Sequence, residues 1–176
     1  MKAHLRDIPI IVLCGGQGTR FRSVFPDRPK VLAPIGNETL LDIIVRQLLE
    51  HDFENIVLSI GYLKEQVKEH CDRCRYPVRF SEESEPLGTG GAVRAALEHV
   101  DADCFFVMNG DMIFNPDFKE IFRFHRKKGG LMSMVLTRRY VGSGGHIVIM
   151  NEEQRIVGWR EKTDADNGEN IHLNAG

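Results

Sequence analysis

The sequence has few cysteines, no long hydrophobic run and no excess of charge of one sign. Four cysteines in 176 residues are too few for a disulfide scaffold, so we expect free thiols. No apolar run approaches the roughly 20 residues that span a bilayer, and the first residues lack the apolar core of a signal peptide. The 23 Lys and Arg nearly balance the 25 Asp and Glu, which excludes the bulk basicity of non-specific nucleic-acid binding. We therefore expect a cytoplasmic protein whose partners include neither a membrane nor a nucleic acid.

Apolar, β-branched runs alternate with segments of helical period along most of the chain. They predict strands over residues 8–14, 55–60, 78–81, 103–108 and 131–137, and helices over residues 39–50, 63–70, 91–99 and 116–128. This order is typical of an α/β protein with a Rossmann-like, doubly wound and mostly parallel sheet. Beyond Tyr140, polar turns separate short strands over 146–150 and 155–160, which predicts a small β-excursion near the carboxyl end. We expect residues 1–176 to form a single domain.

The first predicted strand ends in a glycine-rich turn, L-C-G-G-Q-G-T-R, over residues 13–20. Glycines there let backbone N–H groups approach phosphate oxygens that side chains would exclude. The spacing matches neither the dinucleotide-binding pattern nor the P-loop, and by itself it is equally typical of an ordinary strand-to-helix connection. A local cationic cluster of Arg20, Arg22, Arg28 and Lys30 follows in a chain that is acidic overall, which favours a phosphate site.

Further motifs follow the turn in a fixed order: R-P-K-V-L-A-P-I, E-P-L-G-T-G-G-A, N-G-D, E-K and N-A-G. In this combination the sequence resembles the sugar-1-phosphate nucleotidyltransferases, or NDP-sugar pyrophosphorylases, from Pro9 to the last residue. Two stretches, S-V-F-P-D-R-P-K-V-L-A-P-I and E-S-E-P-L-G-T-G-G-A-V, are most similar to guanylyltransferases for heptose 1-phosphate, followed by those for mannose 1-phosphate. The resemblance implies formation of an NDP-sugar and pyrophosphate, with GTP and heptose 1-phosphate as the expected substrates.

The implied reaction brings two polyanions together, so their mutual repulsion is the main obstacle. The attacking phosphate oxygen is already ionised at neutral pH, and catalysis should consist of alignment and charge neutralisation by Mg²⁺, Arg and Lys. By matching position, the resemblance implies catalytic roles for Arg20, Lys30 and Asp111. Asp111, directly after an apolar strand, is the expected Mg²⁺ ligand, and an Asx-type turn is its structural alternative.

The resemblance also implies two sets of binding residues. The nucleotide would contact Leu13, Gly15, Gly16, Gly18, Thr19, Glu83, Gly88, Thr89 and Gly90. The sugar phosphate would contact Asn109, Gly145, Glu161, Lys162 and Asn174. Glu83 and Glu85 both precede the L-G-T-G segment, and a carboxylate accepts from guanine N1 and N2 better than it meets a pyrimidine. Acidic residues at an ordinary helix N-terminus are the alternative for this pair.

Several expectations stay open. The family continues past N-A-G into a segment with a second metal carboxylate, so we expect this chain to lack its carboxyl-terminal part and to turn over poorly. A nucleotide-sugar binding or regulatory module is one rival function. A molybdopterin guanylyltransferase is another, although the T-R, E-K and N-A-G segments argue against it. Cys71 and Cys74 lack a second cysteine pair, so we expect exposed thiols rather than a zinc site. A homo-oligomer is compatible with the sequence.

Overall fold

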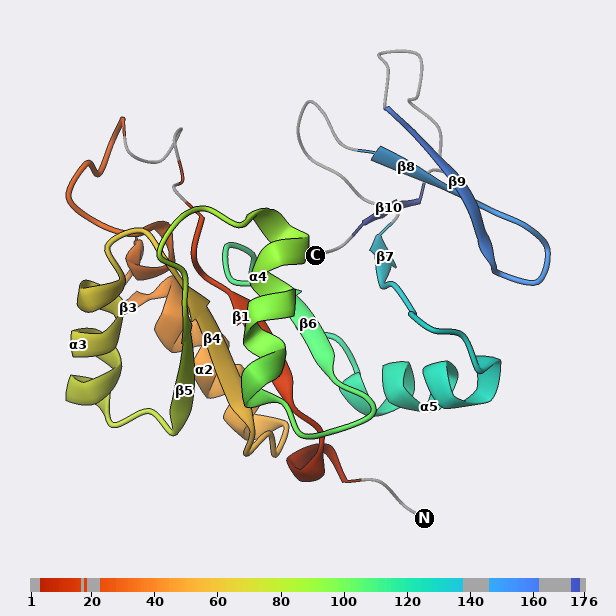
Figure 1. Cartoon of the computed structure of the whole chain (residues 1–176), viewed down its shortest axis with the longest axis horizontal. Coiled ribbons are helices and arrows are strands. Elements are labelled where there is room, and N and C mark those ends of the chain that lie inside the picture. The colour runs from red at the N-terminus through yellow and green to blue at the C-terminus, as the bar shows by residue number, and fades with distance from the viewer. Residues whose placement is uncertain (1–3, 17, 19–22, 138–145, 162–171, 175–176) are drawn as a thin grey trace. The chain divides into compact units, whose positions relative to one another are not determined.

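The structure, a computed structural model, describes residues 4–16, 18, 23–137, 146–161 and 172–174 (Figure 1). The chain divides into two compact units, Met1–Phe118 and Lys119–Gly176. The boundary falls after the first residue of α5 (Phe118–Lys128). The Phe118 ring is buried and packs edge-on against Phe53 and Phe106, with ring centroids 5.0 and 5.4 Å apart.

The first unit is built on a four-stranded parallel sheet in the order β5-β4-β1-β6. Its strands are β1 (Ile10–Leu13), β4 (Ile56–Ile60), β5 (Val78–Glu82) and β6 (Phe106–Asn109). Ile10 of β1 pairs with Ile56 on one side and Phe106 on the other. Every residue of β4 is buried, as an uninterrupted apolar run requires of a strand covered on both faces. The α/β, Rossmann-like, doubly wound sheet expected from the sequence is confirmed.

Helices cover both faces of this sheet. The α-helices of this unit are α2 (Leu40–Glu50), α3 (Lys64–Cys74) and α4 (Gly88–Ala96). The unit also contains the short 3-10 helices η1 (Leu5–Asp7), η2 (Lys30–Leu32) and η3 (Leu97–His99), and an antiparallel ribbon of β2 (Pro34–Ile35) and β3 (Glu38–Thr39). In Figure 1, α4 lies in front of the sheet, where it packs on β1, β4 and β5, and α2 lies behind. The chain winds from β1 outward to β5 and returns through α4 to β6. The winding therefore changes direction between β1 and β6, where sheets of this kind bind ligands.

The partly buried carboxylate of Asp42 fixes the start of α2 and ties it to α3. Asp42 and Thr39 form a capping box, in which Asp42 Oδ2 accepts from Thr39 N at 2.7 Å. Asp42 Oδ1 accepts from Tyr76 Oη and from His70 Nε2, each at 2.6 Å. Burial raises the pKa of Asp42, but the hydrogen bonds from Tyr76, His70 and Thr39 outweigh it and hold that pKa well below its usual range. The charged form is therefore the one that joins the two helices.

Asp42→Asn is expected to lower the free energy of unfolding by about 2 kcal/mol near neutral pH, because the amide loses the charge that three donors stabilise. Since the folded-state pKa lies below that of the unfolded chain, this stabilisation is complete above the unfolded-state pKa, about 3.9. It is lost as the pH falls through the folded-state pKa. Urea unfolding at several pH values measures the effect, with exposed Asp72→Asn as control. An equally steep loss of stability in acid for wild type and Asp42→Asn would contradict the assignment.

The second unit contains a small antiparallel sheet in the order β7-β10-β8-β9. Its strands are β7 (Leu136–Thr137), β8 (His146–Met150), β9 (Ile156–Glu161) and β10 (Leu173–Asn174). Asn151 turns the β8–β9 hairpin, since its Oδ1 accepts from Glu153 N at 3.1 Å and Arg155 N at 2.8 Å. These strands form the β-excursion that the sequence predicts near the carboxyl end.

The predicted strand over residues 131–137 is wrong for most of its length. Only Leu136–Thr137 is a strand, and it pairs antiparallel with β10 rather than extending the parallel sheet. Leu131 is fully exposed and Met132 is 69% exposed, so this apolar run does not enter a core. Periodicity reports the character of a segment but not its pairing partner, which explains the error.

Smaller corrections concern helix ends and thiols. Helix α4 begins three residues earlier than predicted, and α3 continues to Cys74. The four cysteines are free thiols, as expected, but Cys71 is buried and only Cys74 of that pair is exposed. No helix among the described residues is both long enough and apolar enough to cross a membrane.

Candidate functional site

A pocket of about 370 Å³ lies in the first unit, at the carboxyl ends of β1 and β6 and beside the start of α4. Its volume falls within the range of roughly 300–1,000 Å³ that is typical of small-molecule sites. Ten predicted site residues line it: Leu13, Gly15, Gly16, Gly18, Lys30, Glu83, Gly88, Thr89, Asn109 and Asp111. The pocket therefore occupies the place where the direction of winding changes, which is the expected ligand position in a doubly wound sheet.

Two glycines at the pocket leave no room for a side chain. A Cβ at Gly15 would lie 2.5 Å from Glu83 Oε1, and a Cβ at Gly110 would lie 2.7 Å from Cys14 Sγ. Gly110 N also donates to Leu13 O at 2.9 Å, which joins the end of β6 to the glycine turn. Glycines therefore expose backbone along part of the pocket, and a polyanionic ligand can approach that backbone closely.

Lys30 and Asp111 meet at the pocket although 81 residues separate them in sequence. Lys30 Nζ lies 2.7 Å from Asp111 Oδ2, and the two side chains are 40% and 48% exposed. An ion pair this exposed contributes little to stability, about 1 kcal/mol at most. Lys30 and Asp111 can therefore separate and bind charged groups of a ligand at a small cost in free energy.

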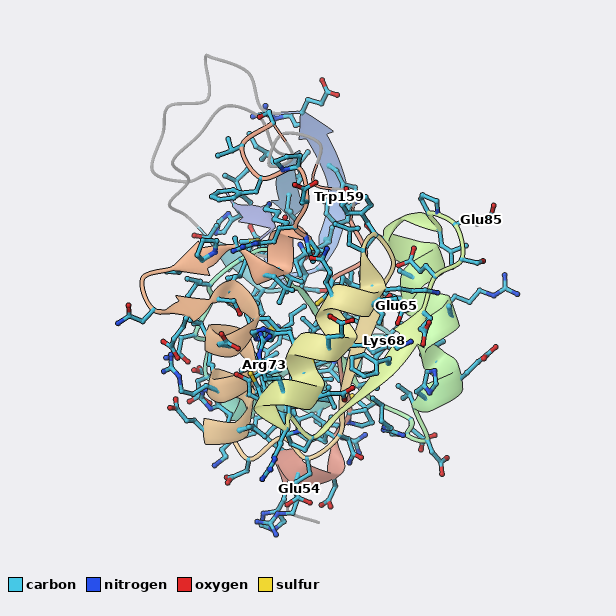
Figure 2. The ribbon with its side chains drawn as sticks, turned by 90° about the vertical axis from the view of Figure 1, so that its left-hand side faces the viewer. Glu54, Glu65, Lys68, Arg73, Glu85 and Trp159 are labelled. Atoms are coloured by element: carbon cyan, nitrogen blue, oxygen red, sulfur yellow. The ribbon has the colours of Figure 1, made fainter. Side chains whose placement is uncertain are left out.

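Glu83 lies between the sheet and α4 with both carboxylate oxygens bonded. Oε1 accepts from Ser59 Oγ at 3.2 Å, and Oε2 accepts from Leu87 N at 3.1 Å, next to the first residue of α4. Gly88 has a φ of +68°, a conformation that favours glycine. Glu85 is exposed on the connection between β5 and α4, where Figure 2 labels it, and does not line the pocket. Glu83, which the resemblance assigns to the nucleotide, therefore lies at the pocket, whereas Glu85 does not.

Other predicted residues are placed outside the pocket or outside the described residues. Gly90 is in the first turn of α4 but not in the pocket lining. Glu161 ends β9 with its side chain exposed, and Asn174 ends β10, both in the second unit. Four lie outside the described residues: Thr19, Arg20, Gly145 and Lys162.

Five lining residues were not predicted: Cys14, Val31, Pro86, Ala92 and Gly110. Each of these five residues lies inside or directly beside a motif that contains predicted site residues. This proximity is the sequence feature from which they could have been predicted. Burial raises the pKa of the Cys14 thiol far above its usual range. Cys14 is therefore a protonated packing residue and a poor nucleophile.

A second polar cluster brings Asp42, His70 and Cys74 together, with their ligand atoms within 4.8 Å of one another. The Arg73 guanidinium lies 2.8 Å from His70 Nδ1 and can only donate, so Nδ1 accepts and Nε2 carries the ring proton. That proton is donated to Asp42. A metal ion would need the lone pair of Nε2, so these contacts favour a hydrogen-bonded network over a metal site.

The Rossmann-like sheet and its glycine-lined pocket define an NTP transferase domain. Residues 10–170 match the model of the MobA-like NTP transferase domain, and the chain belongs to this family of nucleotidyltransferases.

Curated relatives confirm the family resemblance that the sequence motifs indicate. A D-glycero-alpha-D-manno-heptose 1-phosphate guanylyltransferase of Aneurinibacillus thermoaerophilus is 31% identical over 157 residues, 86% of this chain and 66% of its own. One from Campylobacter jejuni is 36% identical over 113 residues, 63% of this chain and 51% of its own. The Drosophila pseudoobscura mannose-1-phosphate guanylyltransferase catalytic subunit beta is 32% identical over 86% of this chain and 43% of its own. The chain thus spans between 43% and 66% of the length of these relatives.

Solved structures share the fold. HddC from Yersinia pseudotuberculosis, complexed with GMP-PN, superposes with a TM-score of 0.71 at 24% identity and covers 95% of this chain and 72% of its own. The inositol-1-phosphate CTP transferase from T. maritima superposes with a TM-score of 0.71 at 21% identity over 100% of this chain and 70% of its own.

Proposed function

We propose that this chain takes part in transfer of the GMP group of GTP to heptose 1-phosphate, with release of pyrophosphate. A phosphate oxygen of the sugar phosphate bonds to the α-phosphorus of GTP, and the bond from that phosphorus to the oxygen of the leaving pyrophosphate breaks. The observation that carries the proposal is the Lys30–Asp111 pair at a glycine-rich pocket beside the carboxyl ends of β1 and β6. The names of the curated relatives support the choice of base and sugar.

Among the described residues, backbone N–H groups and charged side chains have different proposed roles. Backbone N–H groups of the turn around Gly15, Gly16 and Gly18 bind the triphosphate. Lys30 Nζ leaves Asp111 for phosphate oxygens and neutralises the charge that opposes attack, since charge-assisted contacts are strongest where water is excluded. By the resemblance, Thr19 and Arg20 assist at the triphosphate.

Asp111 is the proposed holder of Mg²⁺. Its carboxylate lies at the pocket and is 48% exposed, and a single carboxylate beside phosphate oxygens is a donor set that Mg²⁺ commonly accepts. The ion would supply charge neutralisation at the phosphates. Asp111 would hold the ion by its carboxylate, and Lys30 would then contact phosphate oxygens instead of Asp111.

By the resemblance, contacts to the sugar phosphate are assigned to Asn109, Gly145, Glu161, Lys162 and Asn174. The free thiols support a cytoplasmic reaction, because reduced cysteines are usual there.

A panel of GTP, ATP, CTP and UTP against heptose, mannose and glucose 1-phosphates tests the proposal, with Mg²⁺ present and pyrophosphate release as the readout. We expect GTP with heptose 1-phosphate to be the fastest pair. Tight nucleotide binding without pyrophosphate release from any pair would contradict transfer and favour a binding module.

Glu83→Gln is expected to reduce the preference for GTP over UTP about tenfold, because one of the two carboxylate acceptors facing guanine N1 and N2 becomes a donor. The ratio of kcat/KM values for the two nucleotides measures it. Glu85→Gln is the matched control, since that exposed carboxylate lies outside the pocket lining. Unchanged selectivity in Glu83→Gln, with the fold intact, would assign Glu83 to the structural bonds with Ser59 and Leu87 alone.

A further inference from the structure

The segment over residues 23–28 leads from the glycine turn toward Lys30 and is exposed along its length. Two side chains from the body of the unit hold its backbone. Tyr62 Oη donates to Pro26 O at 3.2 Å, and Gln66 Nε2 donates to Asp27 O at 3.0 Å. The carbonyls of two consecutive residues are thus fixed shortly before the chain reaches Lys30.

Tyr62 also contacts the glycine turn. The backbone N of Tyr62 donates to Gly15 O at 3.4 Å. The preceding Gly61 packs so closely that a Cβ added there would lie 3.1 Å from the same oxygen. Tyr62 lies two residues after the end of β4, at the carboxyl end of the sheet where the pocket lies. One residue therefore bonds to the turn before the exposed segment and to the segment itself.

The helix behind Gln66 is joined to its neighbours by polar contacts. Helix α3, which carries Gln66, is joined to β5 by Lys64 and Lys68, whose Nζ atoms lie 3.0 and 2.8 Å from Glu82 oxygens. Figure 2 labels Lys68 on this helix. The His70–Asp42 hydrogen bond ties the same helix to α2. A hydrogen bond from a helix held in this way fixes the position of its acceptor, whereas one from a mobile side chain would only follow it.

We propose that Tyr62, assisted by Gln66, is a positioning residue that fixes the approach to Lys30 relative to the glycine turn. This inference rests on the proposed function. A lysine side chain is long and flexible, so the reach of its ammonium group depends on where the backbone places it. A misplacement of about 1 Å can cost about 100-fold in rate. Tyr62 acts through Lys30 and need not touch the substrate.

Tyr62→Phe removes the hydroxyl and keeps the ring. We expect kcat for pyrophosphate release to fall about tenfold with little change in the KM for GTP, and Gln66→Met to lower kcat by a smaller factor. In the Lys30→Ala background, Tyr62→Phe is expected to change the rate less than about twofold, because the group that it positions is gone. Tyr76→Phe is the matched control, since it removes a tyrosine hydroxyl bonded to Asp42 and not to the segment before Lys30; it should lower stability and reduce kcat much less than Tyr62→Phe does.

Hydrogen exchange of residues 23–30 in the full chain tests the anchoring without any turnover. Faster exchange in Tyr62→Phe than in wild type, together with the loss of kcat, supports the proposal. Unchanged exchange, unchanged kcat, or the same fold loss with and without Lys30 would each overturn it. If the wild-type chain binds GTP but releases no pyrophosphate, the proposed function is wrong. Exchange then decides the inference: faster exchange of residues 23–30 in Tyr62→Phe supports the anchoring, and unchanged exchange overturns it.

Discussion

Lys30→Ala is expected to slow pyrophosphate release from GTP and heptose 1-phosphate by about 100- to 1,000-fold. The variant removes the cation that counters repulsion between the two phosphates, and losing one such group from a preorganised site typically has an effect of this size. Folding should be nearly unaffected, because the Lys30 side chain is 40% exposed and its ion pair contributes little. Steady-state kinetics of the folded variant measure the effect.

Arg46→Ala provides the control for Lys30→Ala. Arg46 also forms an exposed ion pair, 2.9 Å from Glu38, but it lies on α2 and outside the pocket lining. Near-normal kcat in Lys30→Ala, or an equal loss in both variants, would remove Lys30 from the reaction.

Asp111→Asn is expected to raise the Mg²⁺ concentration needed for half-maximal rate about tenfold and to lower kcat by about 100-fold. The amide keeps the size of the side chain but loses the charge that attracts the ion. GTP binding measured with and without Mg²⁺ gives a second readout, in which the variant should lose mainly the Mg²⁺-dependent part. The circular dichroism spectrum should not change, because Asp111 is half exposed.

Asp103→Asn is the control for this change, since Asp103 is an exposed aspartate just before β6, at the opposite end of the strand. An unaltered Mg²⁺ response in Asp111→Asn would leave Asp111 as the partner of Lys30 alone and would require another holder for the metal.

The core of the first unit was predictable because its strands are recognisable from their own apolar residues. The apolar runs of β1 and β4 can be satisfied only by burial on both faces, and that requirement implies helices on each side of a parallel sheet. The capping box of α2 is likewise a local pattern. Residues 131–135 were not predictable, because an apolar run does not identify the strand with which it will pair.

By itself, the sequence determined the parallel core, the glycine turn and the family, because each depends on neighbouring residues or on motifs in order. Only the tertiary structure decided that Lys30 meets Asp111 and that Tyr62 holds the segment before Lys30. Those contacts join residues from different elements. Their partners are chosen by the way that the strands and helices pack, and packing is a property of the whole chain that no local pattern records.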